Sequence, residues 1–153
     1  MLFILTLLGC SEPGTGGSAM DSGEAQIIID HVGYSAEAIL DTMTLGETVY
    51  QKISLVVSDT FYIDILNENF EEEVMTWTGE SLGAGGTMLF LISRDLGMYN
   101  PHKGFLIISG VTDSTITGRF KFDMYDMASS CVMYPGAEAG MECEGEFFAV
   151  VSS

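Results

Sequence analysis

Alternation of apolar and polar side chains over residues 115–124 restricts the fold of this chain more than any other feature. Ile116, Phe120, Phe122 and Met124 occupy even positions, whereas hydroxyl and charged side chains occupy the odd positions. Successive side chains of a strand point to opposite faces, so this segment is predicted to be a strand that buries one face and exposes the other. The two-residue period therefore indicates a β-sheet protein.

Seven further segments have the composition of strands, because β-branched and aromatic residues dominate them and Gly, Asn, Asp or Ser bound them. They are residues 26–30, 49–58, 61–66, 74–78, 87–93, 105–109 and 146–151. About eight strands in about 130 residues predict an all-β domain: a single antiparallel β-sandwich, with a closed β-barrel as the alternative. One exception is expected at residues 35–45, where Ser35 followed by Ala, Glu and Ala favours a short helix.

Turn residues separate several of these strands. Residues 82–86, 100–101 and 111–114 carry the Gly, Asn, Pro, Asp and Ser that turns favour. A weak internal repeat links residues 117–122 to residues 144–149, since in each a glycine comes two residues before a phenylalanine. Glycine inside a strand often marks a bulge or a close approach of two backbones.

The charge balance argues against one class of partner. The chain has 22 acidic and 5 basic side chains, and its formal net charge is −17 at pH 7. Phosphate binding requires clustered Lys and Arg, and the basic residues here are scattered from Lys52 to Lys121, so no nucleic-acid partner is predicted. Acidity of this kind favours solubility, with binding of a cation or of a basic partner as the alternative.

Two groups of acidic residues are candidate ligands for Ca²⁺, which prefers oxygen donors. One group is the three consecutive glutamates at residues 71–73. The other comprises Asp123, Asp126, Glu138, Glu142, Glu144 and Glu146. Neither group has the spacing of an EF-hand loop, so we expect solvated loops and predict no metal site.

The chain begins with eight residues that carry no charge, followed by Gly9, Cys10 and a polar stretch. As a helix they would extend about 12 Å, much less than the hydrocarbon core of about 30 Å. Residues 1–9 are therefore predicted to be a signal peptide, with a buried strand as the alternative. Residues 7–10, Leu-Leu-Gly-Cys, resemble the lipobox of bacterial lipoproteins. The resemblance implies cleavage before Cys10 and lipidation of Cys10, although the usual basic start is absent because Lys52 is the first basic residue.

The same resemblance implies a location in the cell envelope. The residue after the lipidated cysteine influences sorting in such lipoproteins, and Ser11, which is not Asp, indicates the outer membrane. Gly and Ser dominate residues 11–24, which predicts a flexible linker with an end-to-end distance of about 20 Å. The expected organisation is a signal peptide over residues 1–9, a lipidated cysteine and linker over residues 10–24, and one β-domain over residues 25–153.

Two cysteines remain once Cys10 is assigned to the lipid. Cys131 and Cys143 are predicted to form a disulfide, because exported proteins oxidise paired thiols. Closing a loop of about a dozen residues would contribute on the order of 3 kcal/mol. The alternatives are a reduced buried pair and a metal site, although the two thiols have no nearby His and lack zinc-ligand spacing.

Catalytic motifs are missing from the sequence. The chain has no Ser-centred elbow, paired-His zinc motif, P-loop or dinucleotide fingerprint. His31 and His102 are the two histidines, and an enzyme would require one of them beside carboxylates in a cleft. We therefore predict no catalytic residue and no cofactor, and do not expect an enzyme.

Two binding functions remain. The first is a non-catalytic cell-envelope lipoprotein, attached to the membrane through Cys10, that binds a protein or an envelope component through loops of the sandwich. Exposure of Trp77, Tyr99 or Tyr134 would favour a glycan or a peptide as that partner. The alternative is a lipid-anchored carrier of a small apolar ligand in a barrel. A closed barrel with an unfilled interior would support the carrier, whereas two sheets packed through Phe and Met side chains would support the surface-binding module.

Overall fold

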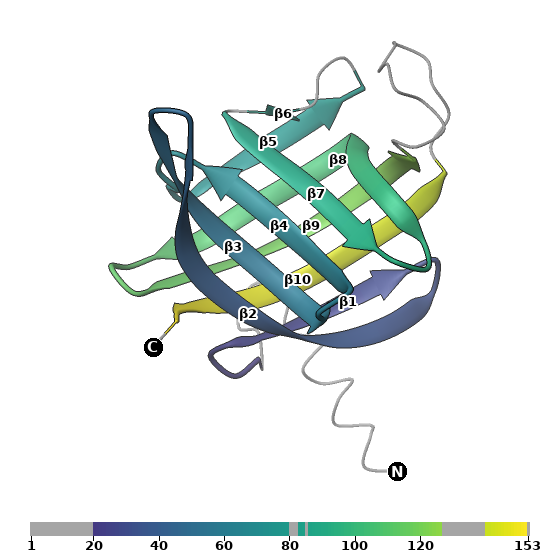
Figure 1. Cartoon of the computed structure of the whole chain (residues 1–153), viewed down its shortest axis with the longest axis horizontal. Coiled ribbons are helices and arrows are strands. Elements are labelled where there is room, and N and C mark those ends of the chain that lie inside the picture. Colours follow the sequence, from purple (N-terminus) through teal and green to yellow (C-terminus); the bar gives the residue numbers. More distant parts are fainter. Residues whose placement is uncertain (1–19, 80–82, 85, 127–139, 153) are drawn as a thin grey trace.

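The computed structural model describes residues 20–79, 83–84, 86–126 and 140–152, and every regular element within these ranges is a β-strand. The strands are β1 (Glu24–Ile29), β2 (Val32–Leu45), β3 (Thr48–Ser58), β4 (Phe61–Asn67), β5 (Glu73–Thr78), β6 (Gly83–Ala84), β7 (Thr87–Ser93), β8 (Gly97–Val111), β9 (Thr115–Asp126) and β10 (Met141–Val151). The prediction of an all-β fold is confirmed (Figure 1).

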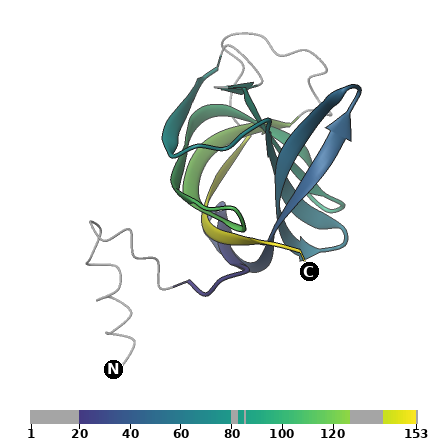
Figure 2. The same ribbon diagram turned by 90° about the vertical axis from the view of Figure 1, so that its left-hand side faces the viewer.

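The strands form one sheet that closes on itself. Its order is β5-β8-β9-β10-β1-β2-β3-β4-β7-β6, and an additional pairing of β7 with β8 closes a ring of eight strands that leaves out β5 and β6. Neighbours are antiparallel, apart from a short parallel contact between β10 and β2. The predicted β-sandwich is therefore wrong, and the closed barrel given as its alternative is confirmed (Figures 1 and 2). A sandwich requires two separate sheets, and here one continuous hydrogen-bonded ladder returns to β8.

The helix predicted over residues 35–45 is also wrong, because these residues belong to strand β2. Pairing of β2 with β1 and with β3 supplies hydrogen-bonding partners on both of its edges. Ala38 and Leu40 alternate with more exposed neighbours and point into the core. Cross-strand pairing and burial thus outweigh the helix-favouring composition of residues 35–38.

Most of the other predicted strands are confirmed, and the predicted turns are confirmed only in part. Within residues 82–86, Gly83–Ala84 form strand β6, which pairs with the start of β7, and residues 82 and 85 lie outside the described residues. Residues 111–114 form the turn between β8 and β9, where the Thr112 amide donates to the Thr115 carbonyl over 2.9 Å. Residues 100–101, predicted as a turn, instead lie inside β8. There the register against β9 shifts between Pro101 and Lys103, and a bulge of this kind tolerates a proline without an amide hydrogen.

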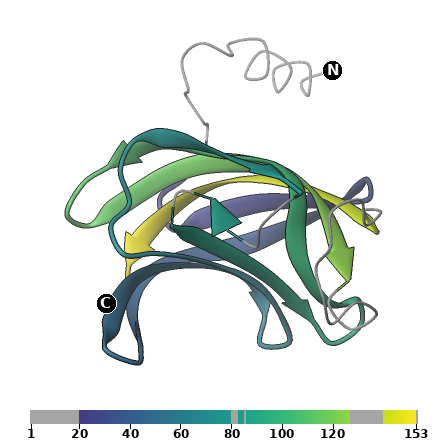
Figure 3. The same cartoon turned by 90° about the horizontal axis from the view of Figure 1, so that it is seen from above.

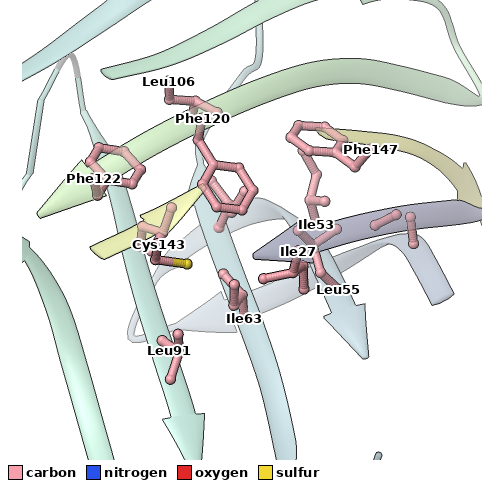
Figure 4. Packing of buried hydrophobic residues seen from close by; sticks show 14 of the residues in the cluster. Ile27, Ile53, Leu55, Ile63, Leu91, Leu106, Phe120, Phe122, Cys143 and Phe147 are labelled. Carbon is pink, nitrogen blue, oxygen red and sulfur yellow. The ribbon is translucent and has the colours of Figure 1, made fainter. Parts of the chain in front are cut away.

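Apolar side chains from all around the ring meet inside the barrel (Figure 4). The face predicted from the alternation in residues 115–124 is buried, since Ile116, Phe120, Phe122 and Met124 are at most 2% exposed. Phe120 and Phe122 stack with their ring centroids 6.0 Å apart. Inward-facing side chains of this size fill the interior of a small barrel, as is usual for eight strands.

Glycines allow the strands beneath these rings to approach closely. Gly118 pairs with Phe147 across β9 and β10, and Gly145 pairs with Phe120. A Cβ atom added at Gly118 would lie 2.7 Å from the Phe147 ring, and one added at Gly145 would lie 2.8 Å from the Phe120 ring. Each ring of the internal repeat therefore covers the glycine of the other strand. This pairing confirms the predicted close approach and permits the curvature that closes the barrel.

Candidate functional site

The barrel wall is interrupted where β8 changes its neighbours. One edge of β8 pairs with β9 along almost its whole length. The other edge pairs with β7 at residues 97–99 and with β5 at residues 103–108, which leaves residues 100–102 without a ladder partner among the described strands. On β7, residues 89–90 lie between the pairing with β6 and the pairing with β8. We call this interruption the seam. It is bordered by residues 87–90 of β7, residues 100–102 of β8 and the facing side of β5.

Figure 1 shows β5 and β6 at the same end of the barrel, above the start of β7 and beside the bend of β8. In the view from above, the β6–β7 hairpin lies over that end of the barrel (Figure 3). The two strands left out of the ring, β5 and β6, therefore occupy the end of the barrel that contains the seam.

Four of the six polar side chains that are buried within the described ranges lie at the seam or contact it, and the other two are Ser54 on β3 and Ser93 at the end of β7. The four are Asn67, Thr87, Asn100 and His102. The Asn67 Nδ2 donates to Thr87 Oγ1 over 2.6 Å, and Thr87 Oγ1 donates to the sulfur of Met75 over 2.8 Å. These contacts join the end of β4, the start of β7 and the middle of β5. A thioether is a weak acceptor, so Met75 holds the hydroxyl of Thr87 only loosely.

Asn100 bridges the gap between β7 and β8. Its Nδ2 donates to the carbonyl oxygen of Leu89 over 3.1 Å, which continues the β7–β8 contacts beyond the last paired residues. Because a carbonyl oxygen can only accept, this bond fixes the orientation of the amide. The Asn100 Oδ1 has no hydrogen-bond partner among the described residues, and the residue is 0% exposed. A buried acceptor without a partner destabilises the folded state by about 1–3 kcal/mol.

His102 lies at the bulge of β8 and is 4% exposed. The backbone after β5 covers it. Gly79 has a φ of +93°, and a Cβ atom there would lie 3.0 Å from His102 Cε1. His31 occupies the two-residue turn between β1 and β2, with a φ of 73°. Neither histidine lies in the two open depressions described next.

An open depression of about 390 Å³ adjoins the seam. Its lining consists of Asn67, Glu68, Asn69, Glu71, Glu73 and Gly86. Asn67 connects the depression to the buried contacts, because its amide also bonds Thr87. The three glutamates are exposed, and none of the described residues that line the depression is basic. A second open depression, of about 500 Å³, lies over β1, β2 and β3 and has a mostly polar lining.

Neither acidic group forms a metal centre within the described residues. Glu71 and Glu73 line the first depression, but no three His, Cys, Asp or Glu side chains of the described ranges are placed to hold one ion. In the second group, Glu144 lies 3.9 Å from the amine of Lys121. Glu138 lies outside the described residues.

The predicted lipidation site and disulfide are only partly covered by the structure. Cys10 and Cys131 lie outside the described residues, so lipidation of the first and pairing of the second stay predictions. Cys143 is a buried free thiol on β10. Burial raises its pKa from 9.0 to about 12, with smaller contributions from the carboxylates of Asp30 and Glu144. A thiol with so high a pKa is not a reactive nucleophile at neutral pH.

Of the three aromatic residues considered for glycan binding, two lie within the described residues and one lies outside them. Trp77 is 3% exposed and packs edge-to-face on Phe122 with centroids 4.9 Å apart, so it cannot stack on a glycan at the surface. Tyr99 is half-buried, and Tyr134 lies outside the described residues. The structure therefore gives Trp77 a place in the interior, on the same strand as Met75.

Sequence reasoning missed Asn67, Thr87 and Asn100. A polar residue at the end of a predicted strand, such as Asn67 after β4 or Thr87 at the start of β7, was available as a signal, but strand ends commonly carry such residues. Asn100 was assigned to a turn because Pro101 follows it. Only the strand pairing shows that Asn67 bonds Thr87 on β7 and that Asn100 bonds the backbone of the same strand at Leu89.

The fold and the seam define the class of this protein: an eight-stranded closed β-barrel with an apolar interior and one polar interruption in its wall. Comparisons of the chain with models of known protein families, with curated proteins and with solved structures found no match. Within the described ranges there is no helix of the length and apolar character needed to cross a membrane. Function is therefore argued from the site.

Proposed function

We propose that the protein is a non-catalytic carrier that binds one small, mainly apolar molecule at the seam end of its barrel. The observation that carries this proposal is closure of the sheet around an apolar interior. Barrels of eight strands are either filled by side chains or hold one small ligand. A closed barrel with an unfilled interior was the feature expected of a carrier, as opposed to a module that binds partners through loops. Closure of the sheet supports the carrier, whereas the side chains that fill the middle of the barrel restrict a ligand to one end of it.

The packing limits where such a ligand could lie. Phe120, Phe122 and Phe147 occupy the middle of the barrel, together with large aliphatic side chains (Figure 4). The seam end is different, because Met75 has a flexible, unbranched side chain that can move without changing the backbone. A small molecule that displaced Met75 would meet Trp77 on one side and the polar residues of the seam on the other.

The lipid anchor at Cys10 is part of the same proposal. An anchored carrier would hold its ligand site within the reach of the linker, about 20 Å from the membrane. Mass spectrometry of the intact protein from host membranes tests this anchor. Loss of residues 1–9 with added acyl mass at Cys10, absent in Cys10→Ala, is the expected result. A chain that retains Met1 and carries no lipid on Cys10 would contradict the anchor and leave the carrier proposal in place.

The carrier function is tested with N-phenyl-1-naphthylamine, a neutral apolar dye whose fluorescence rises in an apolar environment. Trp77 is the single tryptophan of the chain and lies at the seam end, so it serves as an energy-transfer donor to a bound dye. We expect saturable binding at one site, with dye emission on excitation of Trp77. The full chain carrying Trp77→Phe should bind the dye under direct excitation and lose the transferred emission.

Two results would contradict the carrier. One is a dye signal that fails to saturate, because it would indicate only nonspecific adsorption. The other is saturable binding without energy transfer from Trp77, because it would place the dye away from the seam.

A further inference from the structure

We infer that the ligand is a neutral molecule with a hydrogen-bond donor, such as an alcohol, a phenol or a primary amide, and that this donor binds the Oδ1 atom of Asn100. The inference rests on the proposed carrier function and specifies its ligand. It comes from three features: an acceptor that is unpaired among the described residues, a fixed orientation of that acceptor, and the acidic rim of the depression that adjoins the seam.

The acceptor is the feature that most limits the ligand. Asn100 is 0% exposed, and its Oδ1 has no hydrogen-bond partner in the part of the chain that the structure describes. Buried polar groups in folded proteins are nearly always paired, so an unpaired one calls for an explanation. A ligand that donates a hydrogen bond would satisfy this oxygen, whereas a purely apolar ligand would leave it unpaired.

The orientation of the amide excludes the opposite assignment. The Leu89 carbonyl accepts from Nδ2 over 3.1 Å and so holds that end of the amide against β7. Rotation of the amide would place two carbonyl oxygens against each other and break this bond. The site therefore presents a hydrogen-bond acceptor, and a complementary ligand must carry a hydrogen-bond donor.

The acidic rim beside the seam and the net charge limit the charge of the ligand. Glu68, Glu71 and Glu73 line the depression beside Asn67, although Asn100 is not part of its lining, and the whole chain carries a formal charge of −17. A carboxylate would be repelled by this rim and, as a group that only accepts, could not donate to Asn100 Oδ1. A fatty-acid anion is therefore disfavoured, and a neutral donor is favoured.

The test uses two isomers, 1-octanol and heptyl methyl ether, which differ in that only the alcohol can donate a hydrogen bond. Each competes with N-phenyl-1-naphthylamine for the full chain, and octanoate at pH 8 serves as the anionic probe. We expect the alcohol to bind about fivefold more tightly than the ether, the effect of one hydrogen bond of ordinary net strength. Octanoate should bind at least tenfold more weakly than octanol at low salt.

Two variants locate the effect. Asn100→Leu removes the acceptor and keeps the number and branching of the side-chain heavy atoms, and the two isomers should then bind with equal affinity. Asn69→Leu makes the same change at an exposed position of the depression, and the fivefold preference should remain. The isomer ratio in the unaltered protein tests the acceptor even if Asn100→Leu does not fold.

The outcomes separate this inference from the carrier function. Equal affinity for the two isomers in the unaltered protein would overturn the inference and leave a carrier of another ligand class. An unchanged preference in Asn100→Leu would place the acceptor elsewhere and overturn it as well. Tighter binding of octanoate than of octanol would exclude a neutral ligand. Failure of every probe to compete, together with absence of saturable dye binding, would overturn the carrier itself.

Discussion

At the scale of single residues, the glycines beneath the aromatic rings determine whether the strands can pack. Gly118 is the clearest case, because a Cβ atom there would lie 2.5 Å from the carbonyl oxygen of Ile107 and 2.7 Å from the ring of Phe147. The first of these contacts is with the backbone of β8, which cannot move without disturbing the ladder. A side chain at this position must therefore separate β8 from β9 or displace the ring.

We predict that Gly118→Ala lowers the free energy of unfolding by about 2–3 kcal/mol, the usual effect of overpacking a dense core. The measurement is urea denaturation followed by Trp77 fluorescence. Gly33→Ala is the matched control, because a Cβ atom there meets nothing within 4 Å, and its effect should stay within about 0.5 kcal/mol. Equal losses in the two variants would show that β8 and β9 are not as close as the structure places them.

The thiol of Cys143 gives a prediction about pH. Its pKa is about 12 in the folded protein, against 9.0 ordinarily, so the folded state holds the proton more tightly. Stability from this group is fully present below pH 9 and is lost as the pH rises toward 12. Between pH 8 and 10.5 the unaltered protein should lose about 2 kcal/mol more than Cys143→Ala. Urea denaturation of both proteins at the two pH values measures this difference.

A parallel loss in both proteins would contradict a titrating thiol at this position. Iodoacetamide labelling shows which alternative holds. A free Cys143 should resist the reagent in the folded protein and react after unfolding without reductant. A Cys143 that reacts only after reduction would instead reveal the disulfide with Cys131 that the sequence predicts.

At the scale of elements, the sequence identified strands where the two-residue period was strong and failed where tertiary pairing overrode local preference. The alternation in β9 and the β-branched run of β7 were sufficient, and β7 has the predicted bounds. Residues 35–38 have a helix-favouring composition, yet strand β2 forms because β1 and β3 flank it. The local composition of a segment does not determine which strands will pair with it in the folded protein.

Strand β8 shows the same limit at the candidate site. Asn100 and Pro101 resemble a turn, and the chain does bend there, but it remains paired on one edge with β9. The bend transfers the other edge of β8 from β7 to β5 and so creates the seam. A proline-containing bulge and a turn have similar sequence requirements, so the seam could not be located before the ladder was known.

At the scale of the whole molecule, a sandwich and a barrel require the same pattern of apolar and polar residues in each strand. Both bury one face of every strand, so alternation alone could not distinguish them. The paired glycines and phenylalanines of β9 and β10 indicated close approach, and their effect on curvature appears only in the closed sheet. The carrier proposal therefore depends on closure, which is a property of the assembled sheet.

The net charge acts on the molecule as a whole. Opposite charges do little to offset the excess of acidic groups, since the single ion pair found among the described residues is the exposed contact of Lys121 with Glu144 at 3.9 Å. Compaction into a small barrel brings like charges together, and this repulsion destabilises the folded state. Salt shortens the distance over which it acts, from about 30 Å at 0.01 M to about 10 Å at 0.1 M.

We therefore predict that raising NaCl from about 0.01 M to 0.3 M at pH 7 increases the free energy of unfolding by about 1–2 kcal/mol, the scale of a few weakly screened charge contacts. Thermal unfolding followed by circular dichroism measures the change. The matched control is the same titration at pH 4.1, where the sequence predicts zero net charge. Because repulsion is then largely removed, salt should have little effect. A salt response of equal size at both pH values would show that screening of the acidic surface is not its cause, and the argument that an acidic rim repels anionic ligands would lose its support.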